Sequence, residues 1–282
     1  MRRPLLTAAA MALFAGATIF VTDMATSPQA QAAPRADAAL AAAIAGPQRS
    51  AANRARDPYR HPAQTLHFLG IKDHLTVVEI WPGTGWYTEI LAPYLKDRGR
   101  LIIASPPGRG SASIEQRLAI DPDVFTKVER ANFPDVLGGK PVAPGTADLV
   151  VTFRNVHNWR MGAMNANNTD YAADAFQEMF AMLKPGGILG VVDHRLNEDA
   201  DASRERSSGY IKVSTIRALA EQAGFKLVAT SEINANPKDR KDYPNGVWTL
   251  PPVLKLGEQD RAAYLAIGES DRMTLKFIKP RK

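Results

Sequence analysis

The sequence predicts an α/β protein with a doubly wound, mostly parallel sheet. Two observations support this fold class: short apolar runs alternate with amphipathic helices from residue 75 onward, and glycine or proline marks many of the boundaries. Strands that alternate with helices form parallel sheets covered by helices on both faces. Ligands bind such sheets beyond the carboxyl ends of the strands, so we look for functional residues at that edge.

Composition agrees with a globular domain and excludes several classes of protein. The chain has 282 residues, of which 45% are hydrophobic and 23% charged, enough for a sizeable core. Cysteine is absent, which excludes disulfides, cysteine-liganded zinc and thiol nucleophiles. The net charge of +6 comes from scattered basic residues, without the basic and aromatic runs of a nucleic-acid groove. We therefore expect no nucleic-acid partner and no polybasic membrane patch.

Residues 1–32 have the pattern of an export signal. Arg2 and Arg3 form a positive end, 5–21 are apolar, and 30–32 (Ala-Gln-Ala) give a small-x-small cleavage signature. The apolar stretch is almost long enough to span a membrane, so an uncleaved anchor is the alternative. We favour cleavage, which leaves no stable membrane span and predicts a periplasmic or secreted domain. The paired arginines make export by the twin-arginine route a hypothesis.

The first elements follow directly from the pattern. A lead-in over 33–74 contains an arginine-bearing segment at 54–62 and a short helical pattern through 66–69. The domain itself is expected over 75–282. Its first half should contain a strand at 75–80, a helix at 86–95, a strand at 101–104, a helix at 114–119, a strand at 125–128 and a strand at 147–153.

The second half is dominated by a long amphipathic helix over 170–183. Ala173, Phe176, Phe180 and Leu183 lie three or four residues apart and form one apolar face, and Lys-Pro-Gly-Gly is expected to end the helix. The remaining elements are a strand at 188–192, a helix at 213–223, a strand at 225–230 and a last strand at 273–278. The long loop at 234–268 is expected to cover a binding site, since loops of this length are usually functional or disordered.

Three stretches together resemble a known family. The first strand and its turn, 77–87, read VVEIWPGTGWY, and a glycine-rich turn there lets a nucleotide-like ligand approach the backbone. With DLVVTFRNVHNW at 148–159 and LKPGGILGVVDH at 183–194, the order and spacing resemble class I S-adenosylmethionine-dependent methyltransferases. More closely, GTGWYTEILAPYL and GESDRMTLKF resemble a group of exported predicted methyltransferases, over residues 57–282.

The resemblance implies a seven-stranded, Rossmann-like methyltransferase sheet whose last strand is antiparallel. Such a strand starts at the edge where the others end. Glu269, Ser270, Asp271 and Arg272 would therefore lie at the ligand edge.

The resemblance also implies S-adenosylmethionine as the cofactor. In the family, the turn after the first strand holds the methionine part of the cofactor, which corresponds here to Glu79, Gly83 and Gly85. Trp81 stands where the family has its first glycine. Its indole either stacks against the ligand or fills the space of the ligand.

The end of the second strand is a further departure. The family usually places a carboxylate there for the ribose hydroxyls, whereas this chain has Ala-Ser-Pro at 104–106. Ser105 would form a weaker hydrogen bond, or Asn132 and Asp135 would assist from the adenine side. Asn155, after the fourth predicted strand of the domain, is the remaining cofactor-binding candidate.

The catalytic candidates are His157, Asp193 and His194, at the ends of two strands. Methyl transfer is an in-line displacement, so positioning supplies most of the catalysis and a base is needed only where the acceptor loses a proton. Histidine suits that proton transfer. A buried histidine that bonds a backbone carbonyl is the alternative for each ring. No metal site is expected, because these three residues would form one only by long-range coincidence.

The substrate-binding candidates are Arg154, Arg195, Asp271 and Arg272. The arginines are suited to hold a carboxylate or phosphate of the substrate. Pairing of Arg154 and Arg195 with Asp193 or Asp271 in a structural network is an equally weighted alternative.

Two functional classes stay open. The first is a methyltransferase outside the cytoplasm that acts on a small-molecule or envelope-associated acceptor. The second is a methyltransferase-fold binding or accessory protein of the envelope that does not methylate. The motifs favour the first class. Trp81, the missing carboxylate and export away from the compartment that makes S-adenosylmethionine favour the second. The sequence leaves the acceptor, the methylated atom and the oligomeric state open.

Overall fold

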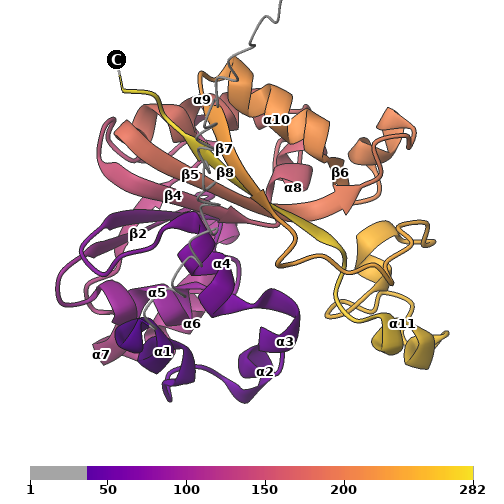
Figure 1. Cartoon of the computed structure of the whole chain (residues 1–282), viewed down its shortest axis with the longest axis horizontal. Coiled ribbons are helices and arrows are strands. Elements are labelled where there is room, and N and C mark those ends of the chain that lie inside the picture. Colours follow the sequence, from indigo (N-terminus) through magenta and orange to yellow (C-terminus); the bar gives the residue numbers. More distant parts are fainter. Residues whose placement is uncertain (1–36, 282) are drawn as a thin grey trace, which may run out of the picture. The chain divides into compact units, whose positions relative to one another are not determined.

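A sheet with strand order β3-β2-β1-β4-β5-β8-β7 organises the computed structural model, which describes residues 37–281 (Figure 1). The strands are β1 (Thr76–Ile80), β2 (Arg100–Ser105), β3 (Glu129–Asn132), β4 (Ala147–Phe153), β5 (Leu183–Leu196), β6 (Ile211–Lys212), β7 (Lys226–Ser231) and β8 (Arg272–Ile278). Pairing is parallel from β3 through β5, and β8 runs antiparallel to β5 and β7. The predicted mostly parallel sheet with an antiparallel last strand is confirmed, with short β6 added beside β5.

Helices cover both faces of this sheet (Figure 1). The α-helices are α1 (Ala38–Ala45), α2 (Ala51–Arg54), α3 (Asp57–Arg60), α4 (Pro62–Leu69), α5 (Thr88–Leu95), α6 (Ala112–Ile120), α7 (Pro122–Phe125), α8 (Val156–Arg160), α9 (Ala172–Met182), α10 (Val213–Gln222) and α11 (Arg261–Ile267). Val78 and Val150 pack toward α8, α9 and α10, whereas Val77 and Leu149 pack toward α1, α4, α5 and α6. Because both faces are buried, β1 and β4 read as nearly continuous apolar runs.

The lead-in helices belong to the apolar layer that contains Val77 and Leu149. Leu40 of α1 and Leu66 of α4 are fully buried against α5 and the sheet. Arg49 is also buried and forms an ion pair with Asp57, Nη1 to Oδ2, at 2.6 Å. The Trp86 indole N–H, in the turn before α5, donates to the backbone carbonyl of Asn53 at 2.9 Å. The lead-in is therefore tied to the domain by apolar and polar contacts.

Two predicted boundaries were wrong. The strand expected at 125–128 is instead β3 at 129–132, because Phe125 is buried as the last residue of helix α7 and the edge strand itself carries polar residues. The predicted helix over 170–183 ends at Met182, and Lys-Pro-Gly-Gly lies inside β5. Gly186 has φ +82° there, a conformation that glycine adopts without strain.

The loop at 234–268 contains a 3₁₀-helix at Gly246–Thr249 and helix α11. Other 3₁₀ turns occur at Gly108–Ser111, Asp135–Leu137 and Ala202–Arg206. The predicted export signal, 1–32, lies outside the described residues. Within 37–281, no helix has the length and apolarity needed to cross a membrane.

Candidate functional site

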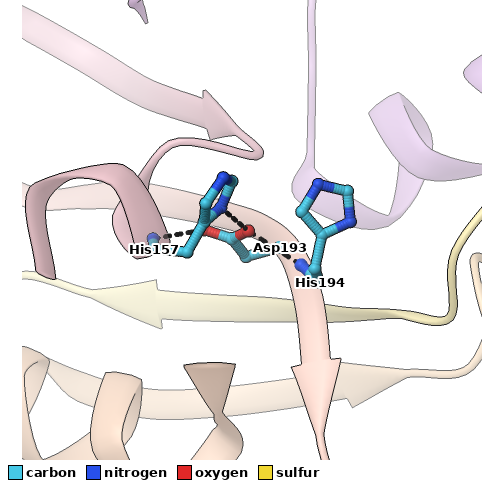
Figure 2. A group of neighbouring side chains, drawn as sticks. All are labelled: His157, Asp193 and His194. Atoms are coloured by element: carbon cyan, nitrogen blue, oxygen red, sulfur yellow. Dashed lines mark hydrogen bonds and ion pairs between the residues drawn. The ribbon is translucent and has the colours of Figure 1, made fainter. Parts of the chain in front are cut away.

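The carboxyl ends of β4 and β5 bring His157, Asp193 and His194 together, and Figure 2 shows the Asp193 carboxylate hydrogen-bonded to the His157 ring, with the His194 ring beside them. His157 belongs to α8, which follows β4, whereas Asp193 and His194 are consecutive residues of β5. The three residues are 3%, 0% and 6% exposed. The structure therefore brings into contact three residues that were predicted to lie at the ends of two strands.

Asp193 fixes the orientation of His157. The His157 ring donates from Nδ1 to Asp193 Oδ1 at 2.7 Å, and the backbone N–H of His157 donates to Oδ2 at 3.2 Å. A carboxylate only accepts hydrogen bonds, so the proton of the neutral imidazole lies on Nδ1. The second nitrogen, Nε2, is left as a proton acceptor.

His194 has a different environment. Its Nδ1 forms a hydrogen bond with the Ser270 hydroxyl, and its ring centroid lies 4.9 Å from that of His157. Burial, together with the nearby His157 and Arg154, holds the pKa of His194 well below its usual range. The His194 ring is therefore neutral at physiological pH, and it forms an uncharged wall beside His157.

The same three residues have the composition of a metal site, with one possible ligand atom from each lying within 4.8 Å of the others. Asp193 already accepts three protein hydrogen bonds, the third from the His194 backbone N–H at 2.7 Å. A carboxylate has about four acceptor positions, so little of its capacity is left for a cation. The donor set favours a hydrogen-bonded histidine–aspartate pair over a metal centre.

A cavity of about 240 Å³ lies in front of this pair, which we call the His157 cavity. Arg154, His157 and His194 line it. Trp248 and Pro251, from the long loop before β8, line it as well. The predicted covering loop thus supplies one wall of a cavity at the expected edge of the sheet.

The glycine-rich turn after β1 has a left-handed backbone. Trp81, Gly83 and Gly85 have φ values of +48°, +61° and +83°. A Cβ on Gly83 would meet no atom within 4 Å, whereas a Cβ on Gly85 would lie 2.9 Å from Ile114. Gly83 therefore leaves open space for a ligand, and Gly85 allows the turn to pack against α6.

Glu79 lies beneath the turn. Its carboxyl accepts a hydrogen bond from the Thr88 hydroxyl at 2.7 Å, and the residue is 2% exposed. Burial raises the pKa of Glu79 to about 7. Near neutral pH this carboxyl is thus divided between its protonated and charged forms.

The Trp81 indole packs against protein atoms. Its N–H donates to the backbone carbonyl of Phe133 at 2.9 Å, and its ring meets that of Trp159 edge to face at 6.0 Å. The indole is therefore held at the ends of β1 and β3 by contacts with the protein itself.

A second cavity, of about 100 Å³, lies between the ends of β2 and β3, and we call it the Ser105 cavity. Ser105 and Asn132 both line it. Ser105 is 4% exposed and its hydroxyl oxygen has no hydrogen-bond partner. Asp135 does not line this cavity and is exposed, so its predicted role on the adenine side is not supported by its position.

Asn155 connects two strand ends. Its side-chain amide donates to the Ile80 backbone carbonyl at 2.9 Å and to the Thr152 hydroxyl at 3.1 Å. The residue therefore holds the β1 turn against β4, close to the expected cofactor position.

The four substrate-binding candidates separate into two groups. Arg195 donates to both carboxylate oxygens of Asp271, at 2.9 and 2.8 Å, which is the structural pairing left open by the sequence. Arg272 instead pairs with Glu269 at 2.9 Å. Arg154 lines the His157 cavity and forms no ion pair within 37–281.

Sequence reasoning missed two residues that reach this region. Arg56 and Arg60 belong to the lead-in, yet both contact Glu269, at 2.6 and 3.3 Å. The only sequence signal for these contacts was the arginine-bearing segment at 54–62. Its partner is more than two hundred positions away, and local patterns do not show such a contact.

No protein-family model and no curated protein matches the chain. Solved structures do match it. A SAM-dependent methyltransferase from Aquifex aeolicus is 13% identical, with 80% of this chain and 93% of that chain covered and a TM-score of 0.54. The [4+2]-cyclase SpnF is 14% identical, with 86% and 92% covered and a TM-score of 0.55. Phosphoethanolamine N-methyltransferase 2 from Haemonchus contortus, in complex with S-adenosyl-L-methionine, is 14% identical, with 79% and 53% covered and a TM-score of 0.52. The fold of this chain is that of the class I S-adenosylmethionine-dependent methyltransferases.

Proposed function

We propose that the protein is an S-adenosylmethionine-dependent methyltransferase that acts outside the cytoplasm on a small-molecule or envelope-associated acceptor. The observation that carries this proposal is the His157–Asp193 pair, which faces a cavity at the carboxyl edge of a methyltransferase-fold sheet. A buried pair of this kind suits proton removal from an acceptor.

Two features of the edge fit the cofactor. Gly83 leaves open space above the turn, and the buried Ser105 hydroxyl lacks a partner beside a cavity. The turn at Gly83 would hold the methionine part, and Ser105 with Asn132 would hold the ribose and adenine side. When bound, the cofactor supplies an electrophilic methyl group.

The residues around the His157 cavity have separate roles in this reaction. His157 accepts the acceptor proton at Nε2, and Asp193 holds the ring and stabilises the imidazolium that forms. Neutral His194 avoids placing a second positive charge beside that imidazolium. Trp248 and Pro251 supply apolar surface to the same cavity beside His157.

Export is the part of the proposal that rests on residues 1–32. S-adenosylmethionine is made in the cytoplasm, and the twin-arginine route carries folded proteins that already hold a ligand. Replacing Arg2 and Arg3 by lysines should therefore abolish export. Unchanged export of that variant would remove the twin-arginine part and leave the enzymatic part untouched.

A specific observation favours a second candidate function, a methyltransferase-fold binding protein without methylation. The Trp81 indole is packed at the end of β1, and β2 ends without a carboxylate. The [4+2]-cyclase SpnF, named for a different reaction, has the same fold. Fold alone therefore does not fix the reaction.

Calorimetric titration of residues 33–282 with S-adenosylmethionine and its demethylated product separates the two functions. We expect micromolar binding to the wild type, and mass spectrometry of the same sample will detect cofactor that co-purifies. Failure of a folded sample to bind either compound would leave the binding-protein function.

Two variants make the titration specific. Ser105→Ala should weaken cofactor binding about tenfold, the value of one hydrogen bond of about 1.4 kcal/mol, without lowering stability, because the hydroxyl has no protein partner. Trp81→Gly restores glycine at φ +48° and should bind the cofactor at least as tightly as the wild type. Weaker binding by Trp81→Gly would instead show that the indole contacts the ligand.

A further inference from the structure

Four arginines converge on one carboxylate, and we call them the arginine cluster. Arg56 and Arg60 come from the lead-in, Arg154 follows β4 and Arg272 begins β8. Glu269 accepts from Arg56 Nε at 2.6 Å, from Arg60 Nε at 3.3 Å and from Arg272 Nη1 at 2.9 Å. The Arg154 guanidinium is near enough to repel Arg60 and attract Glu269.

The cluster has a surplus of positive charge. Glu269, Arg60 and Arg272 are each 3% exposed, so water compensates little of that charge. Burial acts to raise the pKa of Glu269, but the surrounding arginines hold it down to about 2, which makes Glu269 a single fixed negative charge. The other carboxylate that attracts Arg154 is Asp193, which already bonds His157. Four guanidinium groups therefore share one dedicated carboxylate.

Part of the hydrogen-bonding capacity of the cluster is also unused. Each arginine has one buried nitrogen without a partner: Arg56 Nη2, Arg60 Nη2, Arg154 Nε and Arg272 Nε. Buried donors in proteins are nearly always paired, and exceptions call for an explanation such as a missing ligand. Three of these arginines, Arg60, Arg154 and Arg272, line one small cavity, which indicates that an acceptor group belongs among them.

Arg154 connects this surplus to the candidate acceptor site. Its guanidinium forms no hydrogen bond or ion pair with any residue in the described range. It lines the His157 cavity, and with Arg60 and Arg272 it also lines a smaller cavity. Its backbone φ is +64°, and strained residues of this kind cluster at functional sites.

We propose that the arginine cluster binds an oxyanion, a carboxylate or phosphate group of the methyl acceptor, with Arg154 as the contacting residue. The identity of this ligand as the acceptor rests on the proposed function, whereas anion binding itself does not. The planar guanidinium presents a fork of donors that matches two oxygens of either group. At about 240 Å³, the His157 cavity is smaller than pockets for drug-sized ligands, so the acceptor is a small molecule.

The same arrangement selects the class of acceptor. The surplus positive charge repels a cationic acceptor such as a protonated amine. An anion on Arg154 would leave the rest of a small acceptor beside His157, because both residues line one cavity. The acceptor is therefore a small acid with a separate group from which His157 removes a proton.

Anion binding can be measured without cofactor or turnover. Purified protein is titrated with inorganic phosphate and with acetate at constant ionic strength, with chloride as the reference, and both Kd and Tm are recorded. We expect one of these anions to bind with Kd of about 1 mM or tighter and to raise Tm. Tighter binding of phosphate assigns a phosphorylated acceptor, and tighter binding of acetate assigns a carboxylic acid.

Variants at one position test the site. Arg154→Gln should weaken anion binding at least about tenfold while its urea midpoint equals or exceeds that of the wild type, because an unpaired, half-buried cation is removed. Arg154→Lys retains the charge but loses the fork of guanidinium donors, so it should bind the anion with intermediate affinity. This variant keeps the test informative if Arg154→Gln does not fold. Arg100→Gln, at a 53% exposed side chain paired with Glu129, is the control and should bind as the wild type does.

Two results would overturn the inference: no response of the wild type beyond that to chloride, or an equal response from Arg154→Gln. Cofactor titration of the same sample distinguishes this failure from failure of the proposed function. Cofactor binding without anion binding overturns the arginine-cluster inference alone. Anion binding without cofactor binding supports the cluster and overturns the methyltransferase.

Discussion

At the scale of single residues, His157 has one ring nitrogen bound to a carboxylate and the other free for chemistry. Its neighbour His194 has the same side chain but is held neutral by burial and by the positive charges around it. The two rings also have different partners, Asp193 for His157 and Ser270 for His194. Two adjacent histidines thus have distinct chemical capacities.

Replacing His157 by glutamine tests this assignment. We expect kcat to fall about 10²- to 10⁴-fold, the usual contribution of a general base, with little change in cofactor affinity. His74→Gln, at a side chain that is 56% exposed, serves as the control for loss of a histidine. An unchanged kcat in His157→Gln would show that the acceptor needs no base from the protein.

The raised pKa of Glu79 predicts that the stability of the protein depends on pH. Its pKa is 4.5 in the absence of burial and about 7 in the folded protein, so the unfolded chain loses this proton first as pH rises. The free energy of unfolding should therefore fall between about pH 4.5 and pH 7 and then level off.

The measurement is urea unfolding of wild type and Glu79→Gln at pH 5 and pH 8, without cofactor. The wild type should lose about 2 kcal/mol more than the variant over that interval. Glu178, whose pKa is also raised to about 7, is present in both proteins and its contribution cancels. Parallel pH profiles for the two proteins would contradict the burial argument.

At the scale of elements, the turn between β1 and α5 uses two glycines for different reasons. Both have positive φ, but only Gly85 is crowded, with Ile114 and Arg117 2.9 and 3.2 Å from the position of a Cβ. The turn therefore combines an open side and a packed side within three residues.

Alanine substitutions should separate these two reasons. Gly83→Ala should cost about 1 kcal/mol of stability, from backbone strain alone. Gly85→Ala should cost about 2–3 kcal/mol, because side chains of α6 must also move. Urea unfolding measures both costs, and equal costs would refute the packing role of Gly85. Cofactor binding should be weakened by Gly83→Ala, since its methyl group enters the open space.

At the scale of the whole molecule, the lead-in belongs to the core of the domain. Leu40 and Leu66 fill the same apolar layer as α5, and Arg56 and Arg60 reach Glu269 near the end of the chain. Folding of residues 37–74 and assembly of the arginine cluster are therefore coupled.

Leu66→Ala should show this coupling. Leu66 is 0% exposed, so we expect a loss of about 2–5 kcal/mol in the free energy of unfolding within one cooperative transition. Leu265→Ala, on α11 and 48% exposed, should have little effect. A separate early transition in Leu66→Ala, seen by calorimetry, would mean that the lead-in folds independently of the sheet.

The sequence by itself determined the sheet, the antiparallel last strand and the edge where the candidate residues lie. The mostly parallel sheet and its ligand edge follow from apolar periodicity and glycine positions, which are local properties of the chain. The antiparallel last strand was implied by the resemblance to the methyltransferase family. The strand at 129–132 escaped prediction because an edge strand needs few apolar residues, while the nearby apolar Phe125 belongs to a buried helix end.

Only the tertiary structure decided which side chains meet. It joined His157 to Asp193, paired Arg195 with Asp271, placed the Trp81 indole against Trp159, and brought lead-in arginines to Glu269. These contacts join segments far apart in the chain, so their distances and charges depend on packing of the whole sheet. Periodicity predicts which face a residue occupies, whereas a partner is fixed only when the faces of different elements pack together.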